Sequence, residues 1–229
     1  MNKEIAKKET TDVVVPQSRG VGSNVGNEDL LLPRVELTQA LSPSVVAGDV
    51  TAGNLVNSVT KEEIGKEVEI IPIILEKNWI RWIPREEGGG MLWKSSDPAD
   101  PRVIAESQWG ANGEKPLATV YMNYLCILAG ETMPIVVSFS VTSLTAGKQI
   151  FTVAKTYGGD LFSRKYKLSA KLKTNSRGSF YILDIKDGGK CDEADFTVAE
   201  TLYNSFSKKD MNFEAENTST STPKEKTEY

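Results

Sequence analysis

Lysines at four of the five alternate positions between residues 165 and 173 are the clearest chemical signal in the sequence. Side chains alternate between the two faces of a β-strand, so a strand here would place the lysines on one face and Tyr166 and Leu168 on the other. Ammonium groups this close repel one another unless an anion lies against them, and a phosphate backbone supplies that anion. A solvated outer face, or an edge strand protected by lysines against aggregation, would give the same pattern. The lysines concerned are Lys165, Lys167, Lys171 and Lys173.

The region around this predicted strand is basic, although the net charge of the chain is −4. Residues 147–190 contain ten basic and three acidic residues. We expect Lys148, Arg164 and Arg177 to assist the four lysines in contacting phosphates. If about four lysines neutralise phosphates, the logarithm of the binding constant should fall with the logarithm of salt concentration at a slope of about −3.

Aromatic side chains supply the second requirement of a single-strand binder, because each stacked base contributes about 1–3 kcal/mol. Alternation places Lys77, Trp79 and Arg81 on one strand face, which mixes a ring with two cations. Burial in a core is the alternative for every ring. The predicted stacking residues are Trp79, Tyr157, Phe162 and Tyr181, and further candidate rings are Trp82, Trp93 and Phe180.

The composition argues against most kinds of catalytic site. The chain has no histidine, which excludes Ser-His-Asp and Cys-His nucleophilic sites. Its two cysteines, Cys126 and Cys191, form no CxxC motif and indicate reduced, buried thiols. The acidic clusters at residues 97–100 and 192–195 have the pattern of a turn and a helix start, without a recognisable metal-ligand spacing. We therefore predict no enzyme activity, metal or cofactor, and a carboxylate-metal nuclease is the alternative enzyme.

The elements that must position these residues are mostly strands. Pro72 predicts a bulge or an edge in the first long strand. A helical period follows Thr142 or Ser143 and ends near Gly158, and Asp192 is a predicted cap of a last helix. This order predicts a mainly β (α+β) fold, an OB-like β-barrel or curved antiparallel sheet with one inserted helix and a C-terminal helix. The predicted strands are residues 67–75 with an extension towards residue 83, then 120–128, 135–141, 164–173 and 179–186.

The ends of the chain differ from its centre. Polar residues 1–28 and the Ser/Thr/Glu-rich, acidic residues 209–229 predict disordered arms around a single β-rich domain at residues 29–208. No stretch approaches the ~20 apolar residues of a membrane span, and the N-terminus has no apolar signal segment. We therefore expect a cytoplasmic protein without membrane contact, and the sequence leaves its oligomeric state open.

An ordered series of motifs spans most of residues 30–207: residues 32–39, 42–43, 48–57, 71–74 with 77–79, 88–90, 139–144, 178–181 and 202–203. In this order they resemble a family of tailed-phage proteins that are encoded near replication genes and regarded as single-stranded DNA-binding proteins. The resemblance implies that single-stranded DNA is the partner, and that the protein protects it during replication or recombination in the host cytoplasm. The C-terminal tail also resembles those of phage single-stranded DNA-binding proteins, which recruit replication partners. A virion or assembly protein with a β-rich core is the alternative function.

Overall fold

The computed structural model describes residues 31–176 and 178–207. All the elements described below lie in one compact unit that begins at Leu32. Within the described residues the chain forms two antiparallel sheets and four α-helices, so the predicted mainly β class is confirmed. The predicted arms at residues 1–28 and 209–229 lie outside the described residues.

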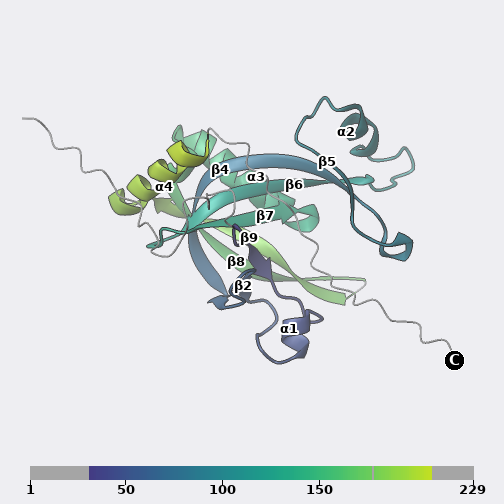
Figure 1. Cartoon of the computed structure of the whole chain (residues 1–229), viewed down its shortest axis with the longest axis horizontal. Coiled ribbons are helices and arrows are strands. Elements are labelled where there is room, and N and C mark those ends of the chain that lie inside the picture. Colours follow the sequence, from purple (N-terminus) through teal and green to yellow (C-terminus); the bar gives the residue numbers. More distant parts are fainter. Residues whose placement is uncertain (1–30, 177, 208–229) are drawn as a thin grey trace, which may run out of the picture. The chain divides into compact units, whose positions relative to one another are not determined.

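The larger sheet has the strand order β7-β6-β4-β8-β9, with β5 paired to β4, and the smaller sheet has the order β1-β2-β3. Figure 1 shows β4, β5, β6 and β7 side by side, with β8 and β9 leaving the sheet as a long hairpin. The strands are β1 (Val35–Leu37), β2 (Leu55–Asn57), β3 (Glu63–Gly65), β4 (Glu67–Trp82), β5 (Met91–Ser95), β6 (Ala118–Leu128), β7 (Pro134–Ser140), β8 (Arg164–Asn175) and β9 (Gly178–Lys190).

β4 is the central strand of the larger sheet. One of its edges pairs with β6 along most of the strand, and the other pairs first with β8 and then with β5. The register with β6 shifts between Pro72 and Ile74, which confirms the bulge predicted at this proline. Because a bulge inserts one residue, the side chains after it exchange faces relative to those before it.

The helices lie on both faces of the larger sheet and at its margins. Asp192 caps the last helix as predicted, by accepting a hydrogen bond from the Asp195 backbone N–H. Ser143 precedes the inserted helix but does not cap it, because its Oγ accepts a hydrogen bond from the Leu183 N–H instead. None of these helices in the described part of the chain is long and apolar enough to cross a membrane. The helices are α1 (Pro43–Val46), α2 (Pro101–Glu106), α3 (Leu144–Tyr157) and α4 (Glu193–Phe206).

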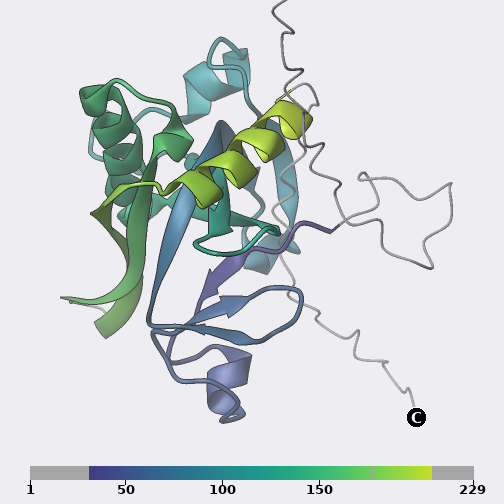
Figure 2. The same cartoon turned by 90° about the vertical axis from the view of Figure 1, so that its left-hand side faces the viewer.

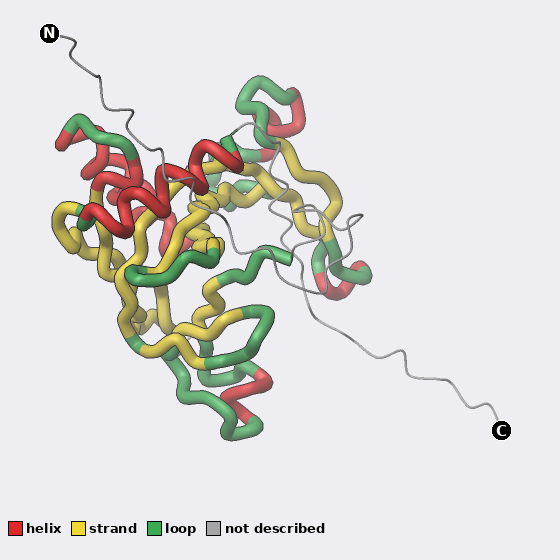
Figure 3. The backbone as a smooth tube through the Cα atoms, turned by 60° about the vertical axis from the view of Figure 1, so that its left-hand side comes forward, coloured by secondary structure: helices red, strands yellow, loops and turns green. Residues whose placement is uncertain are grey.

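Two packed layers define the faces of the larger sheet. We call the face covered by α3 the inner face; its core contains Ile150 of α3 with Tyr124, Tyr166 and Leu168 of the strands. We call the opposite face, where α4 packs, the outer face; its core contains Ile71, Ile73 and Ile127 with Ala199 of α4, among others. Figure 2 shows α4 running diagonally across the strands, and Figure 3 shows the short helices α1 and α2 at the margins.

The predicted barrel is not closed by hydrogen-bonded strands within the described residues, because β7 and β9 end the strand order. The smaller sheet contacts both of these edge strands: its Val35 and Leu55 are buried in the inner-face core, and hydrogen bonds join it to β7 and to β9. The Pro33 carbonyl accepts a hydrogen bond from the Val136 N–H. The Gln39 carboxamide imitates a strand, since its Nε2 donates to the Tyr181 carbonyl and its Oε1 accepts from the Tyr181 N–H, both at 2.9 Å. The larger sheet is therefore curved and open, and the Gln39 side chain joins β9 to the segment that follows β1.

Candidate nucleic-acid interface

The four lysines predicted to share a strand face do so on the outer face of β8. Tyr166 and Leu168 alternate with them and are buried in the inner-face core. The distal half of β8 pairs with β9 beyond the residues that contact β4, so it forms part of a two-stranded ribbon (Figure 1). We call this surface the lysine face. It comprises Lys165, Lys167, Ser169, Lys171 and Lys173 of β8 and their cross-strand neighbours Phe180, Ile182, Asp184 and Lys186 of β9, so one carboxylate of β9, opposite Ser169, shares this face.

Two of these lysines have carboxylate partners on β4. Lys165 Nζ lies 3.1 Å from Glu69 Oε2, and Lys167 Nζ lies 4.0 Å from Glu67 Oε1. The hydrogen bond to the Glu69 carboxylate raises the pKa of Lys165, which therefore stays charged at neutral pH. Ion pairs between partly exposed side chains are weak in water. Phosphates can therefore compete with Glu67 and Glu69 for these two lysines. The sequence-based prediction did not include these two glutamates.

The distal half of the lysine face is different. Within residues 31–176 and 178–207, Lys171 and Lys173 are exposed and form no ion pair with a carboxylate. Lys173 lies directly opposite Phe180, and Lys171 lies opposite Ile182. Cross-strand neighbours on one face have their Cβ atoms about 5 Å apart. The partly exposed ring of Phe180 therefore lies close enough to Lys171 and Lys173 for one bound nucleotide to contact both the ring and an ammonium group.

Loop length could have revealed the position of Phe180 on this face. Asn175 pairs with Gly178, which leaves a two-residue hairpin loop. In such hairpins the loop fixes the register, and the register fixes which side chains share a face. Counting back from this loop places Phe180 beside Lys173 rather than in the core.

The cation–aromatic group predicted around Trp79 also shares one face, but it is the inner face. Lys77 Nζ lies 4.4 Å from the centroid of the Trp79 ring. Trp79 is only 7% exposed, so protein atoms cover its ring. Arg81 Nε lies 3.6 Å from Glu106 Oε2, which offsets its charge. The bulge at Pro72 is the reason for this placement, because it sets the alternation of the second half of β4.

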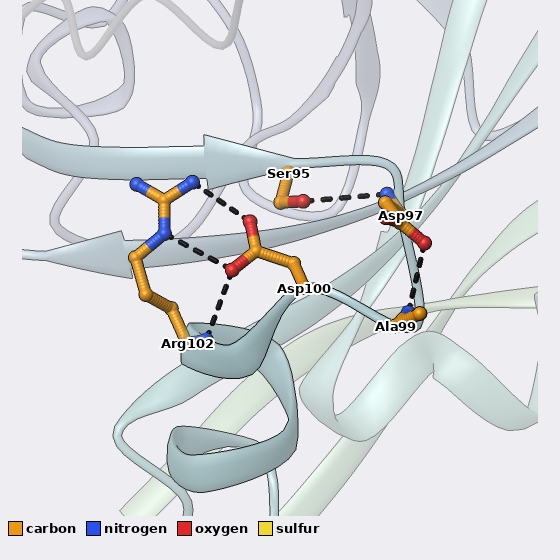
Figure 4. A network of polar contacts seen from close by, with 5 residues as sticks. All are labelled: Ser95, Asp97, Ala99, Asp100 and Arg102. Carbon is orange, nitrogen blue, oxygen red and sulfur yellow. Dashed lines mark hydrogen bonds and ion pairs between the residues drawn. The ribbon is translucent and has the colours of Figure 1, made fainter.

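A second contact between a tryptophan and a cation was not predicted. The guanidinium carbon of Arg102 lies 5.2 Å from the centroid of Trp93. Asp100 holds this arginine by accepting hydrogen bonds from its Nε at 3.1 Å, its Nη2 at 2.7 Å and its backbone N at 2.9 Å (Figure 4). The arginine in turn holds the pKa of Asp100 well below its usual range. Asp97 accepts from the Ala99 N–H, as expected of the predicted turn.

Tyr157 and Arg164 come together at the end of α3. The guanidinium carbon lies 3.9 Å from the centroid of the Tyr157 ring, which is 64% exposed. Arg164 also donates two hydrogen bonds to the Asp187 carboxylate, and this contact lowers the pKa of Asp187. Its charge is therefore offset, and one side of the Tyr157 ring is covered.

Two predicted stacking rings pack inside the protein. Phe162 is 5% exposed and packs against Phe196 and Tyr203, with ring centroids 5.1 Å and 5.6 Å away. Tyr181 lies on the inner side of β9 against Gly53, where an added Cβ would come within 2.6 Å of the ring. Both rings have packing partners where a base was expected.

The last two predicted cations lie elsewhere. Lys148 is exposed on the solvent side of α3, and so on the opposite side of the sheet from the lysine face. Arg177 lies outside the described residues. Of the predicted binding residues, the structure therefore brings the four lysines of β8 together on the outer face.

Carboxylates and thiols are the other groups of the described chain that could take part in chemistry. Within the described ranges, no group of three or more Cys, Asp or Glu side chains is placed to hold a metal ion. Cys126 and Cys191 are both free thiols, and burial raises the pKa of each, that of Cys191 to about 11. The absence of enzyme activity remains a prediction.

Comparison with known proteins identifies the family. The model of a family described as Pam3 phage gp34-like protein matches residues 6–212. No curated protein and no solved structure shows a significant match. The chain therefore belongs to the Pam3 phage gp34-like family.

Proposed function

We propose that this member of the Pam3 phage gp34-like family binds single-stranded DNA, with little sequence preference, along the lysine face of the β8–β9 hairpin. The observation that carries the proposal is that Lys171 and Lys173, which form no ion pair within the described residues, share one strand face with the partly exposed ring of Phe180. Bound there, the protein would protect displaced strands during replication or recombination.

The two kinds of side chain on this face contribute separate terms to binding. Ammonium groups attract phosphates of any sequence and release counterions, which makes affinity depend on salt. A base that stacks on Phe180 adds about 1–3 kcal/mol and does not depend on base identity, because every base has a π-face. The hairpin therefore suits a flexible single strand, whose bases are free to turn towards the ring.

The ion pairs to β4 lower the number of phosphate contacts expected. Lys171, Lys173 and Lys186 are the lysines of this face without a carboxylate partner in the described part of the chain. About three phosphate contacts at about 0.7 released counterions each give a salt slope of about −2. This value replaces the slope of about −3 expected from four free lysines of β8.

Fluorescence anisotropy with a labelled dT oligomer tests the proposal. The variant Lys171→Gln/Lys173→Gln should bind about 25-fold more weakly at 0.1 M salt, because two phosphate contacts are lost, and its slope should be flatter by about 1.4. Phe180→Leu, which keeps apolar volume, should weaken binding about five-fold or more without changing the slope. Arg85→Gln/Lys115→Gln removes the same charge from exposed positions outside the hairpin and is the matched control.

Three outcomes would overturn the proposal. Wild-type protein that does not bind dT, or binds it with no salt dependence, has no such interface. Degradation of the oligomer that depends on Mg²⁺ would indicate the alternative carboxylate-metal nuclease. Ordered oligomers in light scattering, without tryptophan quenching by DNA, would indicate a virion or assembly protein.

A further inference from the structure

The solvent side of α3 carries a second basic and aromatic surface. Lys148, Phe151 and Lys155 follow one another at positions i, i+3 and i+7, which places them on one stripe of the helix. All three are exposed, Phe151 at 43%. Lys155 Nζ lies 5.6 Å from the centroid of the Phe151 ring. We call these three residues the helix stripe.

The helix stripe has no opposing charge of its own. The fourteen residues of α3 include no aspartate or glutamate. Within the described residues, neither lysine of the stripe forms an ion pair with a carboxylate. The stripe thus has the same two components as the distal half of the lysine face, which are two free ammonium groups and a phenylalanine ring. Its charge complements a phosphate backbone and its ring offers a stacking surface.

The helix stripe and the lysine face point in opposite directions. Ala146, Ile150 and Ala154 of α3 are buried towards the sheet, and Ile150 shares a core with Tyr166 of β8. The lysines of β8 alternate with Tyr166 and therefore leave the sheet on its other side. One sheet layer and one helix, about 10 Å or more each, separate the two surfaces. A short oligomer that lies on one surface leaves the other free.

We infer that the helix stripe is a second site for single-stranded DNA, and that one molecule holds two DNA segments at once, on opposite sides of β8. This inference rests on the proposed function of the lysine face and extends it from protection of one strand to bridging of two. Holding two segments raises the effective concentration of each near the other. The expected consequence is faster pairing of complementary strands.

Energy transfer between two short oligomers tests the inference. A donor-labelled and an acceptor-labelled dT oligomer of about eight nucleotides, a length that one such surface can accommodate, cannot pair with each other. Mixed with wild-type protein at equal oligomer concentrations, they should show energy transfer and a stoichiometry of two oligomers per chain. Light scattering of the same sample gives the number of chains per particle.

Matched variants assign the second site. Lys148→Gln/Lys155→Gln changes exposed side chains, so it should fold normally, bind one oligomer per chain and lose energy transfer. Lys171→Gln/Lys173→Gln should also lose energy transfer, because the expected loss of affinity of about 25-fold applies to its lysine face, while the helix stripe still binds one oligomer. Arg85→Gln/Lys115→Gln should behave as wild type. Phe151→Leu should weaken the second binding event about five-fold or more.

The two proposals fail in distinguishable ways. If wild-type protein binds one oligomer per chain with the salt slope of the lysine face and shows no energy transfer, the lysine face stands and the second site is refuted. If Lys148→Gln/Lys155→Gln keeps full energy transfer, bridging arises through association of chains rather than through α3, and the inference is refuted. If no variant and no wild-type sample binds dT, both proposals are refuted.

Discussion

The carboxylates of β4 should restrain DNA binding, and their removal should strengthen it. Glu69 forms an ion pair with Lys165, with an N–O distance of 3.1 Å, and Glu67 forms one with Lys167 at 4.0 Å. In the variant Glu67→Gln/Glu69→Gln both lysines become available to phosphates. The number of contacts would rise from about three to about five, and the salt slope would steepen from about −2 to about −3.5. At 0.1 M salt the two added contacts correspond to about 25-fold tighter binding.

Anisotropy titrations of a dT oligomer between about 0.05 M and 0.3 M salt measure both quantities. The control is Glu62→Gln/Glu63→Gln, which removes two exposed carboxylates at the start of β3, one just before the strand and one at its first residue, and raises the net charge equally. A general charge effect would strengthen binding in both variants. If the β4 carboxylates compete with phosphates, the salt slope steepens only in Glu67→Gln/Glu69→Gln, which we call the β4 variant.

A β4 variant whose slope matches that of the control would refute the reasoning. It would mean that Lys165 and Lys167 do not reach phosphates even when they are free. DNA binding, if it occurs, would then be confined to the distal half of the hairpin or to another surface. A β4 variant that binds more weakly than wild type would show that the ion pairs position the lysines instead of competing for them.

Two further predictions concern stability. Gly53→Ala should lower the free energy of unfolding, measured in urea, by about 2 kcal/mol or more. The φ angle of Gly53 is +88°, and the new Cβ would lie 2.6 Å from the Tyr181 ring. An unchanged midpoint of urea unfolding would contradict this contact. Burial raises the pKa of Tyr166 to about 12, so above pH 10 the unfolded chain ionises first and stability is lost as the pH rises towards 12. Between pH 9 and pH 11, the free energy of unfolding of wild type should therefore fall by about 1 kcal/mol more than that of Tyr166→Phe. Unfolding free energies that fall in parallel in the two proteins would contradict the raised pKa of Tyr166.

Local patterns in the sequence determined the long elements. Period-two alternation predicted β4, β6, β7, β8 and β9, and the inserted helix was predicted from the change of period after β7. The short strands β1, β2, β3 and β5 and the short helices α1 and α2 were not predicted. Pro72 identified a bulge and Asp192 a cap, because each acts through its own backbone or its immediate neighbours. The alternation of lysines along β8 is of the same kind, so their shared face could be read from the sequence.

What the sequence could not show is which surfaces lie together. Trp79 and the lysines of β8 were expected to form one site, but they lie on opposite faces of the sheet. Glu67 and Glu69 could not be recognised as partners of lysines almost one hundred residues away before the pairing of β4 with β8 was known.

The sequence by itself determined that this is a mainly β protein with a lysine-bearing strand, because strand alternation and turn chemistry act over a few residues. Only the tertiary structure decided which lysines are free, which rings are covered and which surfaces face apart. Those properties depend on strand pairing, on a one-residue bulge and on which helix covers which face. Strand pairing and helix packing bring together residues that are distant along the chain, and tertiary packing rather than local propensity determines which of these contacts form.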